Sequence, residues 1–296
     1  MQNHVLTILL GVVAGTLARL VMLRSDYRHY PSYPHGFVTH ISLGFIAALV
    51  GAVAVPALAK PDYAAATFLI LAAQQFREIR NMERETLARI EQTKLVQRGS
   101  DYIEGIAGVF EARNYLVIIT ALATSGANHL WGWPVALGVA VISLVISHLL
   151  MQGECVGDIA DVVPGKVHFD RSLLMVGDVV IMNVGLPAFR EKVLEEGRGV
   201  VLKPRDDDAR LTLDSIGQRQ AILHDISVIL GTKIDEKEME FMPLAKKNAD
   251  TGEIGIFLLP NEPDLECLVE IIKKVPVIES SKARPLSSYY GRRAAD

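Results

Sequence analysis

The sequence predicts an α-helical membrane domain of about five spans over residues 1–151, followed by an α+β soluble domain over residues 165–280. Long apolar runs fill the first half of the 296-residue chain, whereas most charged residues lie in the second half. Half of all residues are hydrophobic, and that average conceals the contrast between the two halves. We therefore expect an integral membrane protein whose first partner is the lipid bilayer.

Three apolar runs are long enough to cross a membrane as helices. A bilayer core about 30 Å thick needs a helix of about 20 mostly apolar residues. Val5–Leu23, Phe37–Ala59 and Pro134–Met151 meet this requirement. Trp131 and Trp133 precede the third run, and tryptophan favours the membrane interface. Each of these runs is predicted to be a span.

Two shorter apolar segments, Tyr63–Phe76 and Tyr115–Leu130, are also interpreted as spans, which gives about five in all. The first of them continues without a helix breaker into residues 77–98. One long helix is therefore expected to leave the membrane and continue into water. Within the first span, Gly11 and Gly15 have the small-xxx-small spacing that lets two helices approach closely.

The basic residues near the apolar runs predict the orientation. If the N-terminus lies outside, Lys60 is the only basic residue in the outer segments. Basic residues near span ends favour the cytosolic side. We therefore expect a multi-pass protein of the cell membrane with its N-terminus outside and its C-terminal domain in the cytosol. The basic residues of the inner segments are Arg24, Arg28, Arg77, Arg80, Arg84, Arg89, Lys94, Arg98 and Arg113.

Residues 77–98 are predicted to form a cytosolic amphipathic helix. Charged residues alternate there with aliphatic ones. Arg77, Arg80 and Arg84 share one helical face, because their spacing is i, i+3, i+7. This arginine face is the obvious electrostatic partner for carboxylates at the membrane edge.

Two such carboxylates, Glu104 and Glu111, share a helical face with Gly108. A carboxylate at the membrane edge is costly unless it is paired or hydrated. We therefore predict that at least one of them contacts an arginine of the 77–84 face, or Arg19 or Arg113. Two interpretations remain open: a polar cluster that lines a conduit or docks a partner, and a structural ion network.

Residues 102–107 read Y-I-E-G-I-A. The sequence thus resembles the YIEGIA-domain membrane proteins of endospore-forming bacteria, over nearly the whole chain. The resemblance implies a role in spore formation and an association with a small companion protein described as a capping subunit. It implies no catalytic residues. The candidate functional residues are Tyr102, Ile103, Glu104, Gly105, Ile106, Ala107, Glu111 and Arg113.

The soluble half has the order β-α-β-β-α-β of a ferredoxin-like unit, followed by an extra strand, helix and strand. A tail over residues 281–296 lacks apolar periodicity and is expected to be disordered. The predicted strands are Leu173–Val184, Gly199–Lys203, Ala209–Leu213, Glu240–Lys247, Glu253–Leu259 and Pro276–Ile278; the predicted helices are Pro187–Glu196, Ser215–Leu230 and Pro263–Lys274.

Sequence signatures of enzymes are missing, including dinucleotide, P-loop, nucleophile-elbow and zinc-protease motifs. The net charge of −4 gives no global field for nucleic acid. Cys155 and Cys267 form no metal-binding pair, and the acidic run Asp206–Asp208 is typical of a solvated turn. We expect no metal and no cofactor.

The sequence therefore favours a non-enzymatic membrane protein that anchors itself and recruits partners, such as other sporulation proteins, through its cytosolic domain. One alternative is a small-solute or ion transport component, which the charged residues near the membrane would support. Another is a membrane-associated protease that lacks a recognised motif. The oligomeric state is left open.

Overall fold

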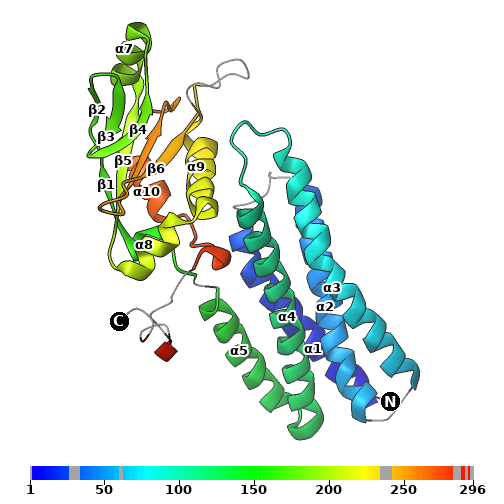
Figure 1. Ribbon diagram of the computed structural model, residues 1–296. Coiled ribbons are helices and arrows are strands. Elements are labelled where there is room, and N and C mark those ends of the chain that lie inside the picture. The colour runs from blue at the N-terminus through cyan, green and yellow to red at the C-terminus, as the bar shows by residue number, and fades with distance from the viewer. Residues whose placement is uncertain are drawn as a thin grey trace. The chain divides into compact units, whose positions relative to one another are not determined.

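The computed structural model describes residues 2–26, 34–59, 63–151, 153–233, 242–282, 288–290 and 293. The chain forms two compact units. The first combines residues 1–86 with 106–152, and the second combines residues 87–105 with 153–296. Helices α3 (Tyr63–Glu91) and α4 (Ser100–Trp131) contribute residues to both units (Figure 1).

The first unit is helical. Besides its parts of α3 and α4, it contains α1 (Gln2–Asp26), α2 (Pro34–Ala59) and α5 (Trp133–Leu149). Among the described residues, three helices are long and apolar enough to cross a membrane. They are His4–Leu23, Phe37–Ala59 and Ser100–Trp131.

The other predicted spans are shorter or belong to longer helices. Tyr63–Phe76 is the first part of α3, and Tyr115–Leu130 is the second part of α4. Helix α5 is apolar but only 17 residues long, which is less than the roughly 20 residues that a straight crossing needs. The expected long helix after Tyr63 is present, and it ends at Glu91 rather than at residue 98.

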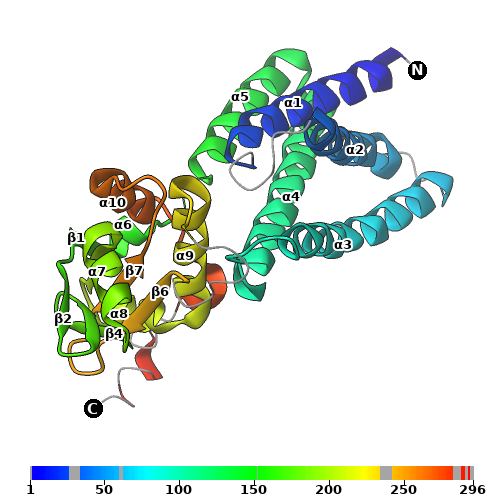
Figure 2. The same cartoon turned by 90° about the horizontal axis from the view of Figure 1, so that it is seen from above.

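Small residues allow α1, α2 and α4 to pack closely, as Gly11 and Gly15 predict. A methyl group at Gly15 would lie 2.7 Å from Cβ of Ala48 and 3.1 Å from Cβ of Ala121. Figure 2 shows α1 running between α2 and α5. The core of the unit is therefore a narrow seam of glycine, alanine and a few larger side chains, among them Met22, Ile79, Phe110 and Val117.

The second unit contains two antiparallel sheets. The larger has the strand order β1-β5-β7-β6, and the smaller has the order β2-β3-β4. All residues of β7 are buried. Strands β5 and β6 pair with it on either side, and β3 and β4 of the smaller sheet contact it. The strands are β1 (Ala160–Pro164), β2 (Val167–Asp170), β3 (Leu173–Val176), β4 (Val179–Asn183), β5 (Arg198–Pro204), β6 (Leu244–Lys247) and β7 (Ile254–Leu258).

Helices complete this unit, and in Figure 1 α7 lies at the end where β2–β4 lie. The three helices predicted from sequence are confirmed as α7, α9 and α10, within two residues at each end. Side chains of Ser215 and Asp264 cap α9 and α10, as serine and aspartate commonly do. The helices are α6 (Val156–Ile159), α7 (Pro187–Glu196), α8 (Asp207–Asp214), α9 (Ile216–Leu230), α10 (Leu265–Lys273) and the 3₁₀ turn η3 (Glu279–Ser281).

The predicted strand Pro276–Ile278 is wrong, because Pro276 forms only an isolated bridge with Cys155. The ferredoxin-like order that precedes it is wrong at two further places. Leu173–Val184 forms two strands instead of one, because the chain reverses at Gly177, whose φ is +57°. Ala209–Leu213 is helical rather than extended. An oxygen of Asp206 accepts a hydrogen bond from the N–H of Ala209 at 2.7 Å and starts α8, so this acidic run is a helix cap and not a hairpin turn.

The boundaries of the second unit also differ from the expected ones. It starts before residue 165, since β1 pairs with β5, and it takes in residues 87–105, which include Tyr102–Gly105 of the motif. The predicted strands Glu240–Lys247 and Glu253–Leu259 correspond to β6 and β7, which pair as an antiparallel hairpin. Residues 240–241 of the predicted strand, and 283–287, 291–292 and 294–296 of the predicted disordered tail, lie outside the described residues.

Candidate functional site

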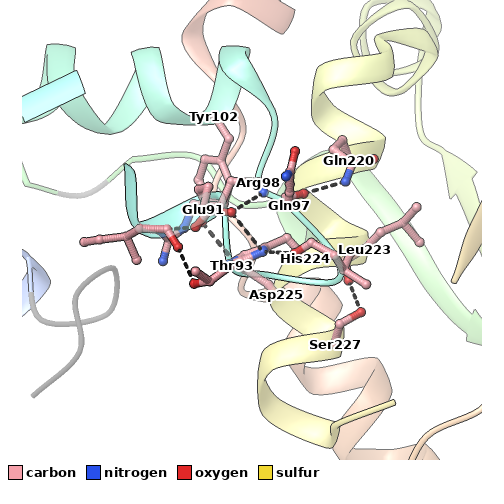
Figure 3. Close-up of polar contacts among 12 residues, drawn as sticks. Glu91, Thr93, Gln97, Arg98, Tyr102, Gln220, Leu223, His224, Asp225 and Ser227 are labelled. Carbon is pink, nitrogen blue, oxygen red and sulfur yellow. Dashed lines mark hydrogen bonds and ion pairs between the residues drawn. The ribbon is translucent and has the colours of Figure 1, made fainter. Parts of the chain in front are cut away.

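The stretch between α3 and α4 is held within the second unit by polar contacts to α9 (Figure 3). It leaves α3 through a turn in which the N–H of Lys94 donates to the carbonyl of Glu91 at 3.0 Å. It reaches α4 through Gly99, whose φ is +83°. A side chain at that position would meet Gln220, so glycine suits both the backbone and the space.

A buried ion pair closes this stretch on itself. Nη1 of Arg98 lies 2.8 Å from Oε1 of Glu91, and the Arg98 backbone N–H donates to Oε2 of Glu91 at 2.7 Å. The two side chains are only 9% and 5% exposed. A pair that is this deeply buried is tolerated only because the opposite charges balance each other and both carboxylate oxygens accept hydrogen bonds.

His224 of α9 binds the same stretch. Its Nδ1 lies 2.8 Å from the carbonyl oxygen of Val96. A carbonyl can only accept, so Nδ1 carries the proton in this contact. Burial is the largest influence on His224 and lowers its pKa; the Val96 carbonyl opposes this, and Arg98 reinforces it. The His224 imidazole, held in this contact, is therefore neutral at pH 7.

The first residue of the motif extends the contact to α4. The hydroxyl of Tyr102 donates to a carboxylate oxygen of Asp225 at 3.1 Å. Its ring meets the His224 ring edge-on, with centroids 6.5 Å apart. The side-chain amide of Gln220 donates to the carbonyl of Gln97. We call the contacts of Glu91–Tyr102 with one another and with Gln220, His224 and Asp225 the clamp.

Most of the YIEGIA motif is buried. Tyr102, Ile103, Ile106 and Ala107 are each at most 8% exposed. A methyl group at Gly105 would lie 3.4 Å from the side chain of Ile278. Glu104 is partly buried. Tyr102, Ile103, Ile106 and Ala107 are therefore packed inside the protein rather than exposed on its surface.

The expected contact between a glutamate of α4 and an arginine of the 77–84 face is present for Glu111. Its Oε2 lies 3.4 Å from Nη1 of Arg80 within the first unit. The side chains are 22% and 44% exposed, so solvent screens the pair. Arg84 is exposed, and the side chain of Arg77 lies outside the described residues.

Arg19 is the centre of a buried polar group in the first unit. It is fully buried in α1, and its Nη2 donates to Nδ1 of His40 in α2 at 3.1 Å. Its guanidinium lies 5.0 Å from the centre of the Phe110 ring, a cation–π contact. Gly44 leaves the space that the Arg19 side chain occupies.

Two further charged groups interact with Arg19. Arg113 of α4 is buried, and its charge acts on that of Arg19. Burial raises the pKa of Glu83 in α3 to about 7, and the positive charge of Arg19 opposes that rise. Arg19 and Arg113 thus belong to one buried cluster, whereas Arg80 pairs with Glu111.

Comparison with known proteins places the chain in a family. A family model described as YIEGIA protein matches residues 7–288. The chain belongs to the YIEGIA family. It is 44% identical over 285 residues to the Uncharacterized protein YphB of Bacillus subtilis (strain 168), covering 96% of each chain. No solved structure matches.

The YIEGIA model extends over residues of both units, so the clamp and the Arg19 cluster lie within the family's shared region. Among the described residues, no group of three or more His, Cys, Asp or Glu could hold a metal ion. The clamp has no nucleophile beside a base; its groups hold one another. The clamp can hold residues 92–99, between α3 and α4, in one position against α9. Because Glu91 and Arg98 are buried, a change in charge within the clamp would weaken that hold.

Sequence reasoning missed Glu91, Arg98, His224 and Asp225 as members of one site. His224 and Asp225 diverge on α9, as expected for adjacent helix positions. His224 nevertheless contacts Val96 in the stretch before α4, and Asp225 contacts the motif tyrosine, Tyr102. The available signal in the sequence was the opposite charges of Glu91 and Arg98, seven residues apart on either side of Gln92–Gln97. Their distant partners could not be read from local spacing.

Proposed function

We propose that this YIEGIA protein is a multi-pass membrane protein that holds its second unit at the cytosolic face and presents it to a protein partner in spore formation. The observation that carries the proposal is the clamp. Residues 87–105, which join two helices of the first unit, are folded into the second unit by a buried ion pair and by Tyr102 and His224.

Anchoring in the membrane rests on the three apolar helices. The proposal adds Tyr63–Phe76 and α5 as further crossings, which gives about five spans with the N-terminus outside. The basic residues near the span ends support this orientation. Under it, the stretch Gln92–Gly99 and the second unit lie on the cytosolic side.

Recruitment is better supported than transport, because the helical seam is closely packed. A methyl group at Gly11 would lie 2.8 Å from the carbonyl oxygen of Ala121 and 2.9 Å from Cβ of Ala52. One at Gly51 would overlap the carbonyl oxygen of Ile118. A water-filled path along this seam would need helices that stand further apart. The Arg19 cluster is therefore proposed as a structural ion network.

The topology predicts which positions a membrane-impermeant thiol reagent can reach. With Cys155 and Cys267 replaced by serine, Lys60→Cys should be labelled in intact cells, because Lys60 is proposed to lie outside. Leu95→Cys should be labelled only after permeabilisation; Leu95 is 48% exposed, so the thiol itself would be accessible. Labelling of Leu95→Cys in intact cells would contradict the orientation.

The recruitment proposal predicts a specific co-purifying protein. Tagged protein solubilised from membranes of sporulating cells should retain a partner, such as the small companion protein, in roughly equal amount. Asp161→Asn, which removes an exposed ion pair with Arg205 in the same unit, should retain it too. Glu91→Gln, which opens the clamp, should lose it. Recovery of the same proteins from an untagged strain would count against recruitment.

A further inference from the structure

His224 lies where protonation would oppose the clamp. The charged groups around it are Glu91 at the end of α3 and Lys94 and Arg98 in the stretch that follows. Tyr102 approaches its ring from α4, and Asp225 is its neighbour on α9. Two cations and one carboxylate therefore act on His224 from the clamped stretch.

The one carboxylate is already used by Arg98. Oε1 of Glu91 accepts from the Arg98 guanidinium, and Oε2 accepts from the Arg98 backbone N–H. Nδ1 of His224 lies 3.8 Å from Oε2, too far for a hydrogen bond. The imidazole is only 2% exposed, so water cannot solvate a new charge while the clamp is closed.

We propose that the clamp is a proton-operated latch, in which protonation of His224 releases the Val96–Gln97 stretch from α9. Release lets water reach the imidazolium and relieves its repulsion with Arg98 and Lys94. The latch rests on the proposed function, because it would regulate how the second unit is presented to a partner.

The direction of the effect follows from proton linkage. Burial holds the pKa of closed His224 below the value of about 6.5 that an open imidazole has. The closed form thus binds fewer protons between those two values, and its stability rises with pH across that window and levels off above it. Between about pH 7.5 and 5.5, the open-to-closed ratio should increase up to about tenfold.

Amide hydrogen exchange of the full-length protein in lipid nanodiscs measures this ratio without any partner. After correction for intrinsic exchange rates, protection of the amides in residues 92–99 should fall up to about tenfold between those pH values. His224→Asn should remove the pH response, since the asparagine amide can still donate to Val96 but cannot be protonated. His168→Asn on β2 is the matched control and should keep it.

Lys94→Gln offers a second variant on an exposed side chain. Removing this cation should raise the pKa of closed His224, so the acid response should become smaller. Protection that is independent of pH in the unmodified protein, or an unchanged response in His224→Asn, would overturn the latch. If acid lowers the protection of residues 92–99 but no partner co-purifies with the protein, the latch stands and the recruitment proposal is rejected.

Discussion

Glu91→Gln is expected to destabilise the second unit by about 3 kcal/mol, the largest effect of a single substitution in the clamp. Arg98 would keep a guanidinium that is only 9% exposed while losing the charge that balances it. Breaking one side of a buried pair costs far more than the pair contributes, because an uncompensated charge stays behind. The full-length protein in detergent is unfolded by denaturant, and cleavage of the second unit by a protease reports the fraction unfolded at each concentration. The change in the free energy of unfolding measures the loss.

The exposed pair Arg205–Asp161 is the matched control. Its atoms lie 2.9 Å apart, and its side chains are 49% and 62% exposed. Asp161→Asn should therefore change stability by less than about 1 kcal/mol. The double variant Glu91→Leu with Arg98→Leu should recover part of the loss, since it removes both buried charges. Equal effects of Glu91→Gln and Asp161→Asn would show that burial is not what matters here.

Gly51→Val is expected to disrupt the first unit. The added Cβ would overlap the carbonyl oxygen of Ile118 in α4, and it would lie 3.1 Å from Cβ of Ala121. Overpacking commonly costs about 1–3 kcal/mol, and the upper end applies here because the obstacle is backbone and not a mobile side chain. Loss of the monodisperse peak in size-exclusion chromatography, at a temperature well below that of the unmodified protein, measures the effect.

Gly126 provides the matched control in α4. A methyl group there would meet nothing within 4 Å, and the same holds for Gly138 in α5. Gly126→Val should therefore leave the elution profile and the thermal midpoint nearly unchanged. If Gly126→Val were as damaging as Gly51→Val, the cost would come from valine in a helix in general rather than from helix contact.

Both effects arise where the chain brings distant segments together. The seam of the first unit depends on close approach between helices, which glycine and alanine permit. The clamp of the second unit depends on buried charge that is fully satisfied. The solvent-screened Arg80–Glu111 pair contributes less to stability than the clamp. The contact favours the interpretation of Glu111 as part of a structural ion network.

Local signals in the sequence determined much of the secondary structure. Pro187 at the start of α7 and Gly231 after α9, with φ of +68°, mark helix ends by their own backbone chemistry. The turn Asn248–Gly252 likewise fixed the β6–β7 hairpin. Apolar runs long enough for a bilayer predicted α1 and α2, whereas the run Pro134–Met151 forms α5, which is only 17 residues long. The YIEGIA letters predicted the family.

The sequence by itself therefore determined the apolar character of the first half, most of the main helices and the family, because hydropathy, capping and motif are properties of short stretches. Only the tertiary structure decided that residues 87–105 belong to the second unit and that the motif tyrosine meets α9. Tyr102 and Asp225 are 123 residues apart, and no local period encodes which distant side chain satisfies a buried one. A buried polar group needs a hydrogen-bond partner because leaving it unpaired is costly, and only the tertiary fold determines which residue lies close enough to be that partner.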